Sequence, residues 1–210
     1  MFGNKEPQQE SGFRIDQLEP QWQPLPEEED PPVKSKPTHT GWRIFYEAAA
    51  VFCTAVLATL LFFVLFRPVT VQGNSMKPTL QNGDYLLLYC FDYIPEQGDV
   101  VVIERENAEP LIKRVVAVAG DTVYIDPVTQ WVYCNGERLE EPYLTTTTPP
   151  LGMTEAVTVP EGHIFVLGDN RYNSHDSRSD DIGMVNVESV IGKALVRLYP
   201  EFTVFDEAGE

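Results

Sequence analysis

Hydrophobic and polar positions divide the chain into three stretches of different character. Residues 1–41 are rich in Pro, Glu and Gln and show no hydrophobic period, which predicts a disordered segment. Residues 48–66 are 19 consecutive positions without a charge, bounded by Glu47 and Arg67. A helix of this length spans roughly 28 Å, close to the apolar core of a bilayer. The pattern therefore predicts one transmembrane helix.

After the apolar stretch the chain changes to short runs rich in β-branched and aromatic residues, separated by Gly, Asn and Pro. Runs of this kind predict β-strands. They lie at residues 85–89, 99–103, 111–119, 122–125, 131–133, 163–167 and 194–198. Since no long amphipathic helix appears, the predicted fold class is mostly β, with an antiparallel β-sheet domain after the single helix.

These changes of pattern also predict the domain boundaries. We expect an acidic, Pro-rich tail at 1–44, a transmembrane helix at 45–67, a β domain at 68–203 and a C-terminal tail at 204–210. Turn residues predict two hairpins in a small insertion at about 120–160.

The basic residues around the apolar stretch bear on its orientation. Lys34, Lys36 and Arg43 precede it, whereas Arg67 and Lys77 follow it, an imbalance that favours a cytoplasmic N-terminus. A cleaved signal peptide fits poorly because 47 residues precede the stretch and no small-x-small site follows it. A buried helix of a soluble protein is the alternative interpretation.

Charge and cysteine content exclude two classes of function. The formal net charge is -17, and an acidic surface repels the phosphates of a nucleic acid. The three cysteines, Cys53, Cys90 and Cys134, include no CxxC pair, which argues against a zinc site. Cys90 and Cys134 are either a disulfide or two free thiols, since their spacing decides nothing.

The candidate chemistry is nucleophilic, and it starts from Ser75, which follows closely on the apolar stretch. A serine hydroxyl needs an adjacent base. Lys113 lies in a predicted strand whose same-face neighbours are apolar, and burial lowers a lysine pKa. Arg114, on the other face, does not lose its proton. The alternatives are a paired or snorkelling Lys113, and a histidine triad through His175.

Four segments then resemble the four sequence boxes of the type I signal peptidases, in the family's order and after its membrane anchor. They are Gly73-Asn74-Ser75-Met76-Lys77-Pro78-Thr79, Gly98-Asp99-Val100-Val101, Lys113-Arg114-Val115-Val116-Ala117-Val118-Ala119-Gly120-Asp121 and Gly168-Asp169-Asn170-Arg171-Tyr172-Asn173-Ser174-His175-Asp176-Ser177-Arg178. The resemblance covers residues from about 45 to 200 and favours lysine over histidine as the base, because His175 falls where the family's motif varies.

The resemblance implies a role for each matching residue. Ser75 is the nucleophile and Lys113 the general base, and Ser174 orients the lysine amine. The supporting positions are an ion pair of Arg114 with Asp169, and Asp176 and Arg178, which the resemblance implies support the site by hydrogen bonds and salt bridging. Five positions match residues that line the substrate pocket, with ordinary core packing as the alternative: Val71, Met76, Leu80, Leu111 and Ile112. No metal or organic cofactor is implied.

The implied function is a serine endopeptidase that removes signal peptides from exported preproteins after small residues, at Ala-x-Ala sites. It implies a single-pass protein of the plasma membrane with the catalytic domain on the outer face, in contact with lipid and near the secretion translocon. One departure concerns the oxyanion hole: Gly73 stands where some members place a serine hydroxyl. The alternative functions are a serine-lysine autoprotease of the SOS-repressor kind and a membrane-anchored binding domain without activity.

Overall fold

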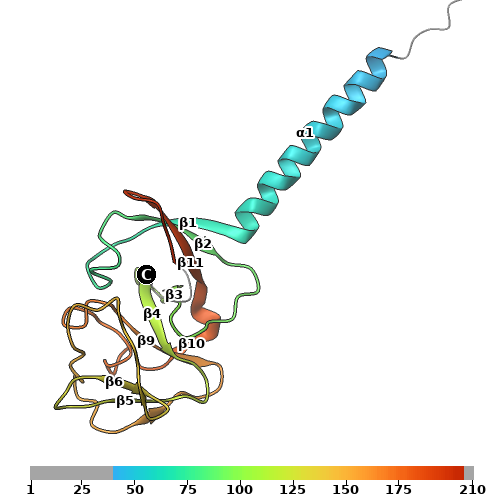
Figure 1. Cartoon of the computed structure of the whole chain (residues 1–210). Helices are drawn as coiled ribbons and strands as arrows, with labels where there is room; N and C mark the ends of the chain where they lie inside the picture. Colours follow the sequence, from blue (N-terminus) through green and yellow to red (C-terminus); the bar gives the residue numbers. More distant parts are fainter. Residues whose placement is uncertain (1–39, 206–210) are drawn as a thin grey trace, which may run out of the picture. The chain divides into compact units, whose positions relative to one another are not determined.

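The computed structural model describes residues 40–205, so most of the predicted N-terminal tail and the C-terminal residues from 206 lie outside the described part (Figure 1). Helix α1 spans Thr40–Leu65, and its segment Gly41–Leu65 is long and apolar enough to cross a membrane. Phe66 and Arg67 already belong to strand β1. Pro68 explains this early end, because proline and the residue before it disfavour helix.

The main sheet contains eight strands in the order β1-β2-β11-β3-β4-β9-β10, with β12 beside β11. Every strand pair in it is antiparallel. Its strands are β1 (Phe66–Thr70), β2 (Tyr85–Tyr89), β3 (Val100–Ile103), β4 (Leu111–Ala117), β9 (His163–Leu167), β10 (Val185–Asn186), β11 (Val190–Tyr199) and β12 (Thr203–Val204). A short 3-10 helix, η2 (Val187–Ser189), joins β10 to β11.

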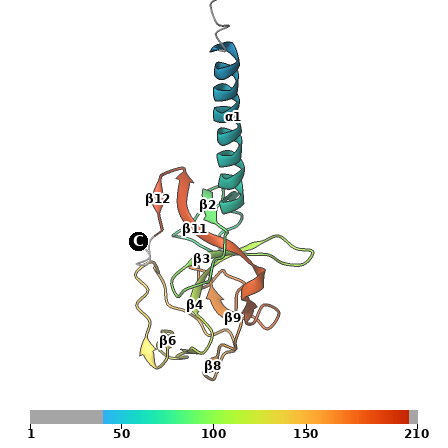
Figure 2. The same cartoon turned by 90° about the vertical axis from the view of Figure 1, so that its right-hand side faces the viewer.

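A second sheet of four short strands has the order β7-β6-β5-β8. Its strands are β5 (Thr122–Ile125), β6 (Val132–Cys134), β7 (Glu137–Arg138) and β8 (Val157–Thr158). Figure 2 shows β6 and β8 at the opposite end of the β domain from β12. The predicted mostly β fold, antiparallel and preceded by one apolar helix, is therefore confirmed, and each of the seven predicted runs contains a strand.

The core explains why the central strands are apolar on both faces. On β3, Val100 and Val102 pack into a cluster with residues of β2 and the β1–β2 loop. Val101 and Ile103, which point the other way, pack against residues of β4 and β9. A third cluster lies between the two sheets. Alternate residues of one strand thus enter different clusters, as the two-residue period of a strand requires.

The cysteines take separate places in this core. Cys90 packs against the cluster at β2, Cys134 belongs to the cluster between the sheets, and both are free thiols. The structure therefore supports the second of the two alternatives, free thiols rather than a disulfide.

Candidate active site

Ser75 lies in the loop that joins β1 to β2. Val71 N donates to Asp84 O at 2.8 Å and closes the base of this loop. Met76 and Leu80 are fully buried in the adjacent apolar cluster and hold the loop against the sheet. Ser75 itself is only partly buried. The buried side chains of Met76 and Leu80 thus fix the loop, while the Ser75 hydroxyl stays accessible.

Lys113, in the middle of β4, reaches this hydroxyl. Its Nζ donates to Ser75 Oγ at 2.7 Å and to Ile112 O at 3.1 Å, and the residue is 1% exposed. The two residues are 38 positions apart in the chain, and the sheet brings them together. A hydroxyl and an amine at this distance satisfy the geometric requirement for proton transfer.

The electrostatic surroundings of Lys113 weaken its hold on a proton. Burial lowers the pKa of Lys113 to about 8, and the nearby carboxylate of Asp176 opposes this effect only in part. The positive charge of Arg105 lowers the pKa further. At pH 8 about half of such amines are neutral, against well under 1% for a solvated lysine. The arrangement can therefore take a proton from Ser75.

The polar segment after β9 packs directly against the Ser75 loop. Asn170 N donates to Ser75 O at 2.9 Å, and Asn170 Nδ2 donates to Asn74 O at 3.0 Å. Gly168 permits this approach, because a Cβ atom there would lie 2.5 Å from Ser75 O and 2.6 Å from Ser174 Cβ. The segment that the composition predicts as a loop is thus a rigid wall of the site.

Asp176 and Arg178 form a buried pair within this segment. Arg178 Nε donates to Asp176 Oδ1 and Arg178 Nη2 to Asp176 Oδ2, each at 2.8 Å. Burial by itself would raise the pKa of Asp176, but the hydrogen bonds and charge of Arg178 outweigh it and leave the pKa below its usual value. Asp176 Oδ2 also accepts from Gly168 N at 3.0 Å, which fixes the turn beside Ser75.

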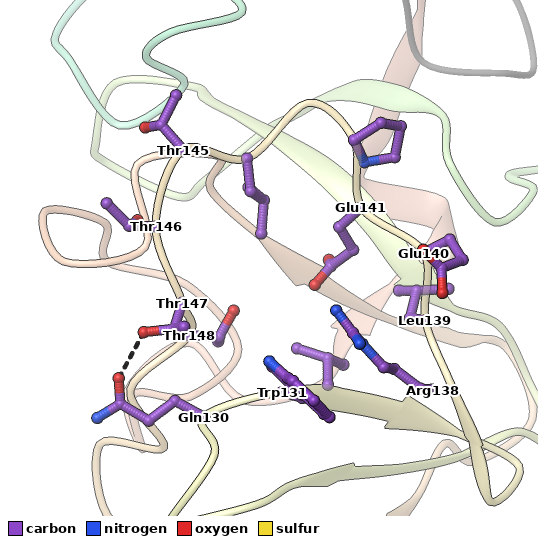
Figure 3. Close-up of a pocket in the computed structure, with 13 residues that line it drawn as sticks. Gln130, Trp131, Arg138, Leu139, Glu140, Glu141, Thr145, Thr146, Thr147 and Thr148 are labelled. Atoms are coloured by element: carbon purple, nitrogen blue, oxygen red, sulfur yellow. Dashed lines mark hydrogen bonds between the residues drawn. The ribbon is translucent and has the colours of Figure 1, made fainter.

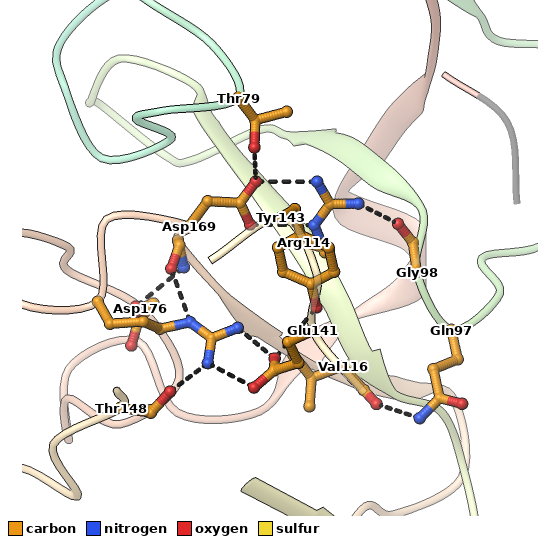
Figure 4. Close-up of polar contacts among 12 residues, drawn as sticks. Thr79, Gln97, Gly98, Arg114, Val116, Glu141, Tyr143, Thr148, Asp169 and Asp176 are labelled. Atoms are coloured by element: carbon orange, nitrogen blue, oxygen red, sulfur yellow. Dashed lines mark hydrogen bonds and ion pairs between the residues drawn. The ribbon is translucent and has the colours of Figure 1, made fainter. Parts of the chain in front are cut away.

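Arg114 and Asp169 form a second buried pair on the opposite face of β4 (Figure 4). Arg114 Nε and Nη2 donate to the two carboxylate oxygens at 3.0 and 2.8 Å. Thr79 Oγ1 donates to Asp169 Oδ2 at 2.6 Å, and the Arg114 guanidinium lies 3.8 Å from the centre of the Tyr143 ring. This pair joins β4 to the loops that carry Ser75 and Ser174.

Ser174 is near the dyad without a hydrogen bond to it. Its Oγ atom is buried and has no hydrogen-bond partner among residues 40–205, so the contact with the Lys113 amine that the resemblance implies is absent from this structure. An open pocket of about 460 Å³ contains both groups. Its lining is Gly73, Asn74, Ser75, Leu111, Lys113, Tyr172, Asn173, Ser174 and His175.

The five predicted substrate-pocket residues divide into two groups. Val71, Met76 and Leu80 are buried in the core. Leu111 lines the pocket that contains the dyad, and Ile112 lines a neighbouring cavity of about 380 Å³. That cavity has apolar walls of Val69, Val102, Ile112 and Ile191.

The alternative base, His175, lines the same pocket but makes no hydrogen bond to Ser75 Oγ within residues 40–205, where the partner is Lys113 Nζ. Its Nε2 lies 2.6 Å from Asp181 Oδ2, and both side chains are more than half exposed. Gly73, with a φ of +88°, adds no side chain to the oxyanion site. The backbone N–H of Ser75 donates to no other residue among those described, so it is available to a substrate oxygen.

Residues that the sequence analysis did not single out complete the site. Arg171 is fully buried and pairs with Glu141 at 2.5 Å. It also donates to Gly168 O at 3.0 Å, and Arg178 Nη2 donates to Arg171 O at 2.8 Å. The two arginines thus connect the second sheet to the wall of the site. In the sequence Arg171 is a charged residue in a turn-like segment, so no pattern indicated that it would be buried.

Comparisons with known proteins identify the family of this chain. A family model described as "Signal peptidase, peptidase S26" matches residues 44–199. Signal peptidase I of Bacillus licheniformis is 34% identical over 180 residues, covering 80% of this chain and 95% of that protein. The probable signal peptidase I-1 of Synechocystis sp. is 34% identical over 181 residues, covering 80% and 89%. A crystal structure of a signal peptidase I from Enterococcus faecalis V583 has 32% identity and a TM-score of 0.40, and covers 48% of this chain and 97% of that one.

These relatives define the class of the protein: it is an enzyme, a serine peptidase. The family model covers well over half of the residues, and two relatives exceed 30% identity over four fifths of the chain. The chain belongs to the signal peptidase family, peptidase S26, and the resemblance of its four segments to that family is confirmed.

Proposed function

We propose that the protein cleaves signal peptides from exported preproteins with Ser75 as nucleophile and Lys113 as general base. The observation that carries this proposal is the 2.7 Å hydrogen bond between Lys113 Nζ and Ser75 Oγ, made by a lysine that is 1% exposed. The names of the relatives, signal peptidases I, supply the substrate class.

In the proposed reaction neutral Lys113 takes the Ser75 proton as Oγ attacks the scissile carbonyl. The resulting acyl-enzyme forms when the C–N bond breaks and Lys113 returns the proton to the leaving amine. Lys113 then removes a proton from a water molecule, which attacks the ester; the C–Oγ bond breaks, Lys113 returns the proton to Ser75 Oγ, and the signal peptide leaves with a new carboxyl terminus. The Ser75 N–H is a donor to the oxyanion. Asp176, Arg178, Arg114 and Asp169 hold the backbone around the dyad, and Ser174 turns its hydroxyl toward the amine.

The cavity beside the dyad supports a preference for small apolar residues before the cut. Its volume is about 380 Å³, and Val69, Val102, Ile112 and Ile191 supply its aliphatic walls, with Thr70, Gln72, Glu109 and Pro110 completing the lining. We propose that it receives the signal-peptide side of an Ala-x-Ala site, with the extended chain alongside Leu111 and Ile112. Val71, Met76 and Leu80 support these walls from the core.

Helix α1 supports a single-pass anchor in the plasma membrane, with the N-terminus in the cytoplasm and the β domain outside. On this topology the bilayer concentrates the enzyme with substrates whose own apolar segments lie in it. Contacts with lipid and a place near the secretion translocon follow from the same proposal. So does a division into an N-terminal tail, the membrane helix α1 (Thr40–Leu65) and a catalytic domain that begins with β1.

The test uses detergent-solubilised full-length protein and a preprotein with an Ala-x-Ala site. Wild type should cut after the second Ala, whereas Ser75→Ala and Lys113→Ala should not. His175→Ala is the control, since its ring pairs with exposed Asp181. Cleavage by Lys113→Ala together with inactivity of His175→Ala would restore the histidine triad. If the wild-type protein cut no preprotein, the alternative of a membrane-anchored binding domain without activity would be favoured.

A further inference from the structure

A pocket of about 370 Å³ on the second sheet lies outside the dyad pocket (Figure 3). Its polar rim is formed by four consecutive threonines, Thr145 to Thr148, and by Gln130. The Arg138 guanidinium covers the Trp131 ring at 3.7 Å and forms one side. Nothing in the proposed chemistry at Ser75 uses these residues.

Tyr172 joins this pocket to the active site. It lines the dyad pocket and is 62% exposed, and its hydroxyl donates to Gln130 Oε1 at 2.9 Å. Thr147 Oγ1 donates to the same Gln130 oxygen at 2.7 Å (Figure 3). The two pockets therefore share a hydrogen-bonded wall.

The buried ion pair of Arg171 and Glu141 fixes the two pockets relative to each other. Glu141 lines the threonine pocket, and Arg171 precedes Tyr172 and donates to Gly168 O beside Ser75. Breaking such a pair is costly, so the distance between the pockets varies little. A substrate leaving the dyad past Tyr172 meets a preformed surface.

The threonine segment offers main-chain hydrogen bonds. Thr145, Thr146 and Thr147 are exposed, and their backbone N–H and C=O groups bond to no other residue within 40–205. Thr148 N, by contrast, donates to Gln130 O at 2.9 Å and anchors the end of the segment. An extended peptide can pair with such a segment as an added strand.

The charges around the pocket nearly cancel, which bears on what it binds. Arg138 and Glu140 are exposed and of opposite sign, and Glu141 is neutralised by Arg171. Recognition through the main chain and without a net charge suits a ligand whose side chains vary. The separate cavity lined by Val69, Val102, Ile112 and Ile191 is more apolar and suits the apolar segment of a signal peptide.

We propose that the threonine pocket binds the first residues of the mature segment of the preprotein, extended past Tyr172 and hydrogen-bonded through their main chain to Thr145–Thr147. This inference rests on the proposed function and extends it to the leaving side of the cut. It assigns the second sheet a role in substrate binding.

The test compares two peptides with the same signal peptide and Ala-x-Ala site, in detergent with full-length enzyme. One has a mature segment of about two residues and the other of about ten, roughly 7 and 33 Å extended. We expect kcat/KM to be about tenfold higher for the longer peptide, mainly through a lower KM, as one or two hydrogen bonds supply. N-methylation of the mature amides beyond the second should remove that gain.

Two variants on one residue test the main-chain contact in the protein. Thr146→Pro removes the backbone donor and should lose the gain, whereas Thr146→Ala keeps the donor and should retain it. If Thr146→Pro fails to fold, the N-methylated peptides assayed with the wild-type enzyme still test the main-chain contact. Equal kcat/KM for the two peptide lengths, or a gain that survives N-methylation, would overturn this inference and leave the proposed function intact. If the wild-type enzyme cut neither peptide, the proposed function itself would be contradicted.

Discussion

Lys113 and Arg114 are consecutive on β4, yet their side chains leave the strand on opposite faces. Lys113 Nζ lies 2.7 Å from Ser75 Oγ, whereas Arg114 Nη2 lies 2.8 Å from Asp169 Oδ2. The alternation of a strand thus separates a cation that can lose its proton from one that cannot. Lys113 can therefore act as a base, whereas Arg114 holds β4 to the loops of the site.

The pH dependence of cleavage should report the ionisation of Lys113. Its pKa of about 8 means that the neutral base forms as the pH rises, so kcat/KM should increase about tenfold per pH unit below pH 8 and level off above it. Replacing Arg105 by Gln removes a positive charge that lowers this pKa, so the midpoint should move to higher pH. Initial rates on a fluorogenic Ala-x-Ala peptide measure both. An unchanged midpoint in Arg105→Gln would argue against Lys113 as the titrating base.

The same ionisation should affect stability. Because folding lowers the pKa of Lys113 to about 8, the unfolded chain binds more protons between about pH 8 and 10.5, and the free energy of unfolding rises with pH across that window. At pH 7 the buried lysine therefore costs on the order of 3 kcal/mol. Lys113→Met should recover most of this at pH 7 and much less at pH 10. Urea unfolding at the two pH values measures it, and an equal gain at both would contradict the assignment.

Breaking the Arg114–Asp169 pair should destabilise the β domain. Both residues are at most 2% exposed, so Arg114→Met leaves a buried carboxylate without its partner. The free energy of unfolding should fall by about 3–5 kcal/mol. The double variant Arg114→Met with Asp169→Leu should regain part of that loss, because it removes both charges. Denaturant unfolding of the three proteins gives the comparison, and additive losses in the double variant would contradict the pairing argument.

Ser174 and Ser177 provide a matched pair of hydroxyls. Ser174 Oγ has no partner among the described residues, whereas Ser177 Oγ accepts from Val166 N at 2.9 Å. Ser174→Ala should lower kcat about tenfold with little change in Tm, as expected for a hydroxyl that orients Lys113 only during the reaction. Ser177→Ala should lower stability by about 1 kcal/mol and leave kcat unchanged. If Ser174→Ala lowered stability and left kcat unchanged, whereas Ser177→Ala lowered kcat, Ser174 would have no part in the mechanism.

Gly168→Ala should disturb the site without changing any polar group. The added methyl would lie 2.5 Å from Ser75 O, which is backbone and cannot give way as a flexible side chain would. We expect the Ser75 loop to shift, with kcat/KM down by about a hundredfold, since a displacement of about 1 Å costs that much. Peptide kinetics and a thermal melt measure the effect. Full activity in this variant would show that the contact with Ser75 O does not position the nucleophile.

Local patterns in the sequence determined the elements and the candidate residues. The charge-free stretch predicts α1, and the short β-branched runs predict the central strands, because both depend on the spacing of apolar residues along the chain. Strand alternation alone separates Lys113 from Arg114, and the four segments identify the family. The two-residue strands β7, β8, β10 and β12 escaped prediction because two residues have no period, and β1 escaped it because its first residues continue the apolar stretch.

Only the tertiary structure decided how these residues meet. Ser75 and Lys113 are 38 positions apart, and Arg171 and Glu141 are 30 apart, so sheet register and loop packing set their distances. Val71, Met76 and Leu80 have the same apolar character as Ile112, yet they lie in the core and Ile112 faces a cavity. The shared wall at Tyr172 arises in the same way. For Lys113 the strand pattern indicated apolar neighbours, but the extent of its burial comes from the packing. Burial and distance are properties of the packed molecule, and no short-range pattern encodes them.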